Sequence, residues 1–237
     1  MMFLRKTIRQ YLSRKLQVTE IPNALDRLAK LGFSPNHIFD VGAYQGDFTK
    51  LCLHYFPKSK VTCFEVLEHR VQQLKQLALQ NSAIQVFPVL LGAESQEKVQ
   101  FNEAETASSI LIEQVKQNFT VKSYPMTTVD TIVHEHFNGF PPALLKLDVQ
   151  GYELEVLKGA EKSLTQTQLI LAEVNLLDIH KDVPLLAEVV GWLNERDWVA
   201  YDICGLTRRP LDQALWQADF IFIPRNSPLI SDKRWKA

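Results

Sequence analysis

Residues 38–46 read Ile-Phe-Asp-Val-Gly-Ala-Tyr-Gln-Gly, and this stretch decides the fold. A short apolar run ends at Asp40, Gly42 follows two residues later, and Gly46 follows four residues after that. Residues 47–56 have the apolar spacing of a helix and stop before a proline. The stretch therefore predicts a buried strand that turns tightly into a helix, where glycines and the helix N-terminus let a ligand approach the backbone.

The composition is that of an ordinary globular protein, with 46% hydrophobic and 22% charged residues in 237. The net charge of −1 gives no overall attraction to nucleic acid, so we expect no nucleic-acid partner. Cys52, Cys63 and Cys204 lie in apolar segments, which predicts reduced core thiols and no disulfide framework or metal cluster. No apolar run approaches the roughly 18 residues of a membrane span. The first residues lack a signal-peptide pattern, so we expect a cytoplasmic protein.

The chain divides into two expected parts. Residues 1–22 predict a basic amphipathic helix, because Leu4, Ile8 and Leu12 share one face and no acid precedes Glu20. Such a helix can contact an anionic membrane surface or a partner, or it can pack on the domain edge with its basic face in water. We favour the second reading. Residues 23–237 are expected to form one domain.

Strands and helices alternate along that domain. Each predicted strand is a short apolar run, and each predicted helix has apolar residues at helical spacing. The alternation predicts parallel strands joined by right-handed crossovers, and so a doubly wound α/β sheet. Pro88 places its strand at an edge or a bulge. The last two strands are joined by a loop, which predicts an antiparallel hairpin. Beyond the first strand and helix, the predicted strands are 60–65, 84–91, 143–149, 169–174, 198–203 and 219–224, and the predicted helices are 24–31, 68–80, 152–164 and 183–196.

An insertion at residues 94–143 interrupts the alternation between the third and fourth core strands. Residues 98–102 predict a short strand, whereas 110–118 and 129–133 have weaker helical patterns. Insertions of this size between core elements are usually lids or walls that face a substrate. We therefore expect this segment to border the site.

Four predicted strands end in carboxylates, namely Asp40, Glu65, Asp148 and Glu173. Parallel strands present their carboxyl ends at one edge, which is where open α/β sheets bind ligands. One acid at a strand end is commonly a helix cap or a surface charge, but four at one edge favour a site. Glu65 follows Asp40 by 25 residues, close to the roughly 20 that place an acid on a ribose diol. A nucleoside-containing ligand is therefore predicted.

The turn itself indicates which nucleoside cofactor is bound. A dinucleotide site needs a glycine where the backbone approaches the pyrophosphate. Here Tyr44 follows Ala43, and its side chain would crowd a pyrophosphate, while Asp40 would repel one. A carboxylate at this place suits a cationic amine or sulfonium instead. The pattern favours S-adenosylmethionine over NAD.

These residues resemble the FkbM-type S-adenosylmethionine-dependent methyltransferases. The resemblance covers roughly residues 25–228 and rests on residues 39–46, 63–65, 108–109, 145–160 and 218–223. The turn after the first strand is a weak signal alone, but together with Asp148-x-x-Gly151-x-Glu153 it is specific. The family usually has Asn where Tyr44 stands and often Glu where Gln150 stands.

The resemblance implies a Rossmann-like class I methyltransferase fold for residues 23–237, with a mostly parallel seven-stranded sheet and an antiparallel last strand. It assigns Asp40 and Gly42 to the methionine part of the cofactor, Glu65 to the ribose, and residues 89–91, with Leu90 at their centre, to the adenine. Three turn residues complete the predicted cofactor site: Ala43, Tyr44 and Gly46. The acceptor implied is a hydroxyl on a sugar, a glycolipid or another natural product.

Methylation of a hydroxyl benefits from a base that takes its proton. Asp148 is the first candidate, and Glu173 and His180 on neighbouring segments are the next. Asp148 could instead cap the helix that begins near Tyr152, and His180 could be a surface loop residue. Asp148 and Glu173 together could hold a divalent metal, but no third ligand is evident, so no metal is predicted.

Two other functional classes remain open at this stage. A Rossmann-type NAD(P) oxidoreductase would bind the dinucleotide, and a non-catalytic adaptor would bind a nucleoside cofactor and turn over nothing. The sequence leaves the identity of the acceptor and the oligomeric state undetermined.

Overall fold

The computed structural model describes residues 19–103, 108–111 and 120–235. The basic helix expected over residues 1–22 lies outside the described residues except for its last four positions. Most of the helix expected over 110–118 also lies outside them. Within the described ranges, no helix is both long enough and apolar enough to cross a membrane.

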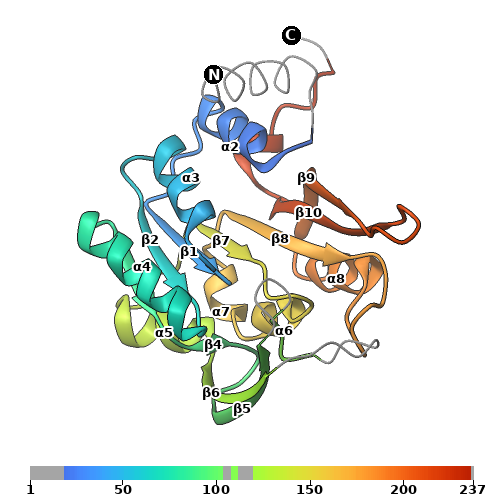
Figure 1. Ribbon diagram of the computed structural model, residues 1–237. Coiled ribbons are helices and arrows are strands. Elements are labelled where there is room, and N and C mark those ends of the chain that lie inside the picture. The colour runs from blue at the N-terminus through green and yellow to red at the C-terminus, as the bar shows by residue number, and fades with distance from the viewer. Residues whose placement is uncertain (1–18, 104–107, 112–119, 236–237) are drawn as a thin grey trace, which may run out of the picture.

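Seven strands form the main sheet, in the order β3-β2-β1-β7-β8-β10-β9 (Figure 1). The pairs from β3 to β8 are parallel, whereas β10 runs antiparallel to both β8 and β9. The predicted doubly wound sheet with an antiparallel last strand is confirmed. The strands are β1 His37–Val41, β2 Lys60–Phe64, β3 Ile84–Phe87, β7 Leu144–Leu147, β8 Leu169–Asn175, β9 Trp198–Arg208 and β10 Leu215–Pro224.

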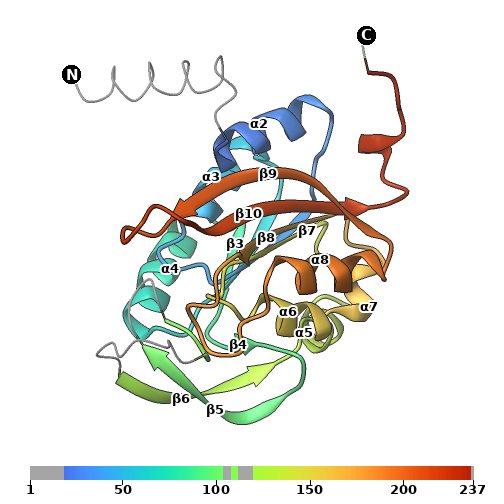
Figure 2. The ribbon, with the colours of Figure 1, turned by 90° about the vertical axis from the view of Figure 1, so that its right-hand side faces the viewer.

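Helices cover both faces of this sheet, and Figure 2 shows α2 and α3 on one side of β9 and β10 with α5 to α8 on the other. One buried cluster joins α2, α3 and α4 to the sheet, and a second joins α5 to α8. Fully burying a leucine such as Leu28 or Leu74 contributes about 1.5–3 kcal/mol. The helices are α2 Ile21–Lys30, α3 Asp47–Tyr55, α4 Glu68–Gln80, α5 Val129–His136, α6 Glu153–Lys158, α7 Glu161–Leu164 and α8 Leu186–Asn194, followed by a 3-10 turn, η2 Pro228–Ile230.

Two strands of the insertion, β5 Gln96–Glu103 and β6 Thr120–Thr127, form a second sheet with the short β4 Leu90–Leu91, in the order β4-β6-β5. It lies beyond the ends toward which β1 and β2 point (Figure 1). Phe101 of β5 is buried with Val66 and Leu67, which follow β2. The insertion therefore packs against the carboxyl edge of the main sheet.

Three elements differ from the sequence expectation. The run 84–91 divides at Pro88 into edge strand β3 and the short β4, because proline cannot continue the ladder. Strand β6 was not predicted, since its polar sequence has little alternation. The single helix expected over 152–164 is two helices, α6 and α7. They separate at Gly159, where a Cβ would stand 1.9 Å from the carbonyl oxygen of Gly92.

Candidate functional site

The turn after β1 packs directly on the turn after β7. Gly42 has φ +75°, and a Cβ there would stand 1.9 Å from the carbonyl oxygen of Asp148. Gly46 has φ +80° and begins α3, and its neighbours are Leu74 and Leu77 of α4. Glycine adopts this left-handed backbone without a steric cost. The packing of Gly46 is against a helix, so its side-chain-free surface makes room for α4.

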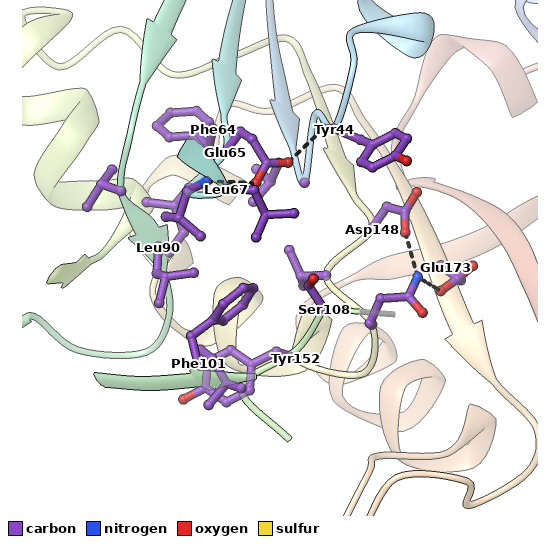
Figure 3. A pocket seen from close by; sticks show the side chains of 18 residues that line it. Tyr44, Phe64, Glu65, Leu67, Leu90, Phe101, Ser108, Asp148, Tyr152 and Glu173 are labelled. Atoms are coloured by element: carbon purple, nitrogen blue, oxygen red, sulfur yellow. Dashed lines mark hydrogen bonds between the residues drawn. The ribbon is translucent and has the colours of Figure 1, made fainter. Parts of the chain in front are cut away.

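A cavity of about 260 Å³ opens at the carboxyl edge of the sheet (Figure 3). Its polar wall includes Glu65, Asp148 and Glu173, three of the four predicted strand-end acids. Its apolar wall comes from the end of β2, from β4 and from the insertion strand β5. The apolar wall includes Phe64, Val66, Leu67, Val89, Leu90, Leu91 and Phe101.

Glu65 lies at the end of β2 and turns its carboxylate toward backbone amides. Oε2 accepts a hydrogen bond from the N–H of Tyr44 at 2.9 Å, and Oε1 accepts from those of Val66 and Leu67 at 2.7 and 2.9 Å. Burial raises the pKa of Glu65, and the three amides oppose that effect. A carboxylate has about four lone-pair directions, so Oε2 can still accept from a ligand hydroxyl.

Asp40 was predicted at the ligand-facing edge, but its side chain is fully buried and does not line the cavity. Oδ2 accepts a hydrogen bond from the Thr49 hydroxyl of α3 at 2.7 Å. Oδ1 lies 3.4 Å from the ammonium of Lys146. The carboxylate therefore sits between β1 and α3, behind the turn that it was expected to flank.

Lys146 of β7 connects the two turns and was missed by the sequence reasoning. Lys146 is only 5% exposed. Besides its contact with Asp40, its ammonium lies 3.3 Å from the carbonyl oxygen of Gly42 and 3.1 Å from Asp148 Oδ2. Burial alone would lower the pKa of Lys146, but the charges of Asp148 and Asp40 raise it above its ordinary value. The available signal was a lysine inside the apolar run of residues 143–149, since a buried lysine needs an anionic partner.

Asp148 accepts hydrogen bonds from Lys146 and, at 3.0 Å, from the amide of Gln150. The alternative reading of Asp148 as a helix cap is wrong, because the N-cap of α6 is Tyr152 and makes no side-chain cap bond. The Asp148 side chain remains 40% exposed and lines the cavity. It is therefore held in place and open to a ligand.

Gln150 bridges two acids, because its amide nitrogen also donates to Glu173 Oε2 at 3.0 Å (Figure 3). Its φ is +54°, and the Ser109 hydroxyl donates to its carbonyl oxygen at 2.9 Å. Glu153 Oε1 accepts from the N–H groups of Val149 and Gly151 at 2.9 and 3.2 Å. Burial raises the pKa of Glu153 to about 7. The loop after β7 is thus fixed from both sides.

The remaining predicted residues divide between the cavity and the core. Tyr44 and Leu90 line the cavity, and the guanidinium of Arg70 lies 3.8 Å from the centre of the Tyr44 ring and donates to its hydroxyl. Ala43 is buried, and its N–H donates to the carbonyl oxygen of Phe64 at 3.1 Å. His180 is 1% exposed, so it is not a surface loop residue, and it is not among the cavity-lining residues.

In the described part of the chain, no group of three or more His, Cys, Asp or Glu side chains is arranged to hold a metal ion.

These residues fit S-adenosylmethionine. Glu65 has one lone pair free for a ribose hydroxyl, and the apolar wall around Leu90 suits an adenine. Gly42, which has no side chain, lines the same cavity. Phe64 and Phe101 provide aromatic surface on that wall. Tyr44 borders the same turn, where a pyrophosphate would need a glycine.

Comparison with known proteins identifies the family of the chain. The methyltransferase FkbM domain matches residues 40–199, more than half of the chain. The crystal structure of methyltransferase FkbM from Methylobacillus flagellatus KT matches with a TM-score of 0.51 and 16% sequence identity. The match covers 80% of this chain and 44% of the Methylobacillus chain. A candidate O-methyltransferase from Klebsiella pneumoniae has a TM-score of 0.50 at 11% identity, covering 86% of this chain and 77% of its own. No curated protein matches the chain.

At these identities the structural likeness establishes the fold alone. The domain match extends from Asp40 in β1 to Val199 in β9, and so it includes Glu65, Asp148 and Glu173 at the cavity. The chain belongs to the FkbM family of methyltransferases, whose methyl donor is S-adenosylmethionine.

Proposed function

We propose that the protein transfers the methyl group of S-adenosylmethionine to a hydroxyl of a small-molecule or glycan acceptor. The observation that carries the proposal is the distribution of groups around one cavity. Glu65 and the apolar wall lie on one part of it, and the Asp148–Gln150–Glu173 cluster lies on another. A nucleoside and an acceptor can therefore occupy adjoining parts of the same space.

In this proposal the cofactor is held chiefly by Glu65 and by apolar contact. A charge-assisted hydrogen bond from a ribose hydroxyl to Oε2 of Glu65 would contribute about 1.5–3 kcal/mol. Leu90 packs against the adenine, and Gly42 and Tyr44 border the methionine part. Asp40 and Gly46 support the turn from behind, since their contacts are with Thr49 and α4.

The bound cofactor supplies an electrophilic methyl group, so the protein has to align the acceptor and receive a proton. Alignment of reacting groups can account for about 7–11 kcal/mol of a barrier. Asp148 is the residue we assign to the proton, because it is partly exposed in the cavity and oriented by Lys146 and Gln150. A positioned base contributes roughly 10²–10⁴-fold. His180 has no part in this proposal, since it does not line the cavity.

Calorimetry with the purified protein tests the cofactor assignment directly. Binding of S-adenosylmethionine and S-adenosylhomocysteine without binding of NAD is the expected result, and preferential binding of NAD would overturn it. Mass spectrometry of metabolite extracts incubated with protein and methyl-labelled S-adenosylmethionine then identifies the acceptor. Label found on nitrogen or carbon, and absent from oxygen, would contradict the assignment to hydroxyl groups.

A further inference from the structure

Glu173 has an asymmetric hydrogen-bond environment. The amide of Gln217 donates to its Oε2 at 2.6 Å, and the amide of Gln150 donates to the same oxygen at 3.0 Å. Two donors match the two lone pairs of one carboxyl oxygen. Among the described residues, both hydrogen bonds to Glu173 therefore go to Oε2, and Oε1 is left for a proton or a ligand.

The charges that face Glu173 are mostly negative. Asp148 lies at the end of β7, Glu153 in α6 and Asp219 in β10, and each carboxylate opposes ionisation of Glu173. Lys146 favours ionisation of Glu173, but Lys146 is already paired with two other carboxylates at 3.1 and 3.4 Å. Burial, followed by these three acids, raises the pKa of Glu173 well above its ordinary value. Burial likewise raises the pKa of Asp219 to about 6.

We propose that Glu173 is a neutral carboxylic acid in the working protein and that its Oε1–H donates a hydrogen bond into the cavity. The group that it would recognise is an oxygen of the acceptor, such as a second hydroxyl or an ether next to the hydroxyl that is methylated. An ammonium has donors only and would not pair with it. This part rests on the proposed function. The acceptor class it identifies is an oxygen-rich compound with neighbouring oxygens, and Glu173 positions that compound while Asp148 receives the proton.

A neutral Glu173 has a consequence that needs no acceptor. Glu173→Gln has the shape of the protonated acid, keeps an oxygen for Gln150 and Gln217, and puts donors at the Oε1 position. When the folded state holds a proton that the unfolded state releases, stability falls as pH rises above the ordinary carboxyl pKa. Glu173→Gln has no titrating carboxyl at this position, so its stability does not fall with pH for this reason. We expect it to melt about 2 °C or more above the wild type at pH 8, with the difference shrinking toward pH 5.

Glu97→Gln is the matched control, because Glu97 is exposed on β5. Its melting temperature should differ little from that of the wild type at either pH. Carbon NMR of glutamate-labelled protein provides a second readout, in which the signal lost in Glu173→Gln should have the shift of a protonated carboxyl at pH 7. A carboxylate shift for that signal, or a variant less stable than the wild type at pH 8, would overturn the proposal.

Activity provides the third readout once an acceptor is known. Glu173→Gln should keep kcat within a few-fold, whereas Glu173→Ala should raise KM for the acceptor about tenfold or more. A kcat lost in both variants, with cofactor affinity unchanged, would mean that an ionised Glu173 is required and would refute the proposal. A wild type that methylates nothing would contradict the proposed function, and the melting and NMR results would still decide the state of Glu173.

Discussion

The carbonyl oxygen of Asp148 lies 1.9 Å from the point where a Cβ on Gly42 would stand. The turn after β1 and the turn after β7 are therefore in backbone contact, without a side chain between them. Since the first borders the proposed cofactor part of the cavity and the second carries Asp148, their spacing would set the distance between the two proposed halves of the site.

Gly42→Ala should destabilise the protein by about 2–4 kcal/mol, because it combines a left-handed backbone with overpacking. Urea unfolding measures the change. Gly32→Ala is the matched control: Gly32 has φ +88° but no atom within 4 Å of a Cβ, so only the backbone strain applies. Equal losses in the two variants would contradict the contact between the turns.

Glu65→Gln should weaken S-adenosylhomocysteine binding about 10- to 150-fold, the effect of losing about 1.5–3 kcal/mol of charge-assisted hydrogen bonding. Calorimetry measures it. Glu68→Gln, on the exposed start of α4, should bind as the wild type does. Because Glu65 also accepts from three backbone amides, Glu65→Gln is preferable to Glu65→Ala, which would leave all three unpaired. Wild-type affinity in Glu65→Gln would remove Glu65 from the cofactor site.

Lys146→Met should destabilise the protein by about 3–5 kcal/mol, since it leaves the carboxylate of Asp40 buried without its cation. Chemical denaturation measures the loss. The double variant Lys146→Met with Asp40→Asn should recover part of it, because no buried charge then remains unpaired. If the double variant loses the sum of the stabilities lost by the two single variants, Lys146 and Asp40 are not energetically coupled.

Asp148→Asn should lower single-turnover methyl transfer by roughly 10²-fold or more while cofactor affinity stays within a few-fold. Stability should fall by about 1 kcal/mol, because an asparagine oxygen cannot accept well from both Lys146 and Gln150. Asp197→Asn is the control, at a side chain that is 89% exposed and a φ of +61° that asparagine tolerates. A wild-type rate in Asp148→Asn would exclude Asp148 as the base.

The sequence by itself determined the order of strands and helices, since buried strands and amphipathic helices have distinct apolar spacing. The hairpin of β9 and β10 and the edge position of β3 at Pro88 could be read in the same way. Strand β6 could not, because a strand in a small peripheral sheet needs little apolar alternation. The cofactor turn was also recognisable, because Gly42 needs a positive φ that few other residues adopt.

Only the tertiary structure decided what each strand-end acid does. Glu65 lies one residue beyond β2 and reaches the cavity, whereas Asp40 lies inside β1 and points beneath α3. The register pairs Asp40 with Cys63, two residues before Glu65, so the two acids differ in depth along the sheet: one lies inside the ladder as part of a buried ion pair, and the other lies past its end at the cavity. The pairing of Lys146 with Asp40 and the bridge of Gln150 between Asp148 and Glu173 depend on distances between strands, which no single segment encodes.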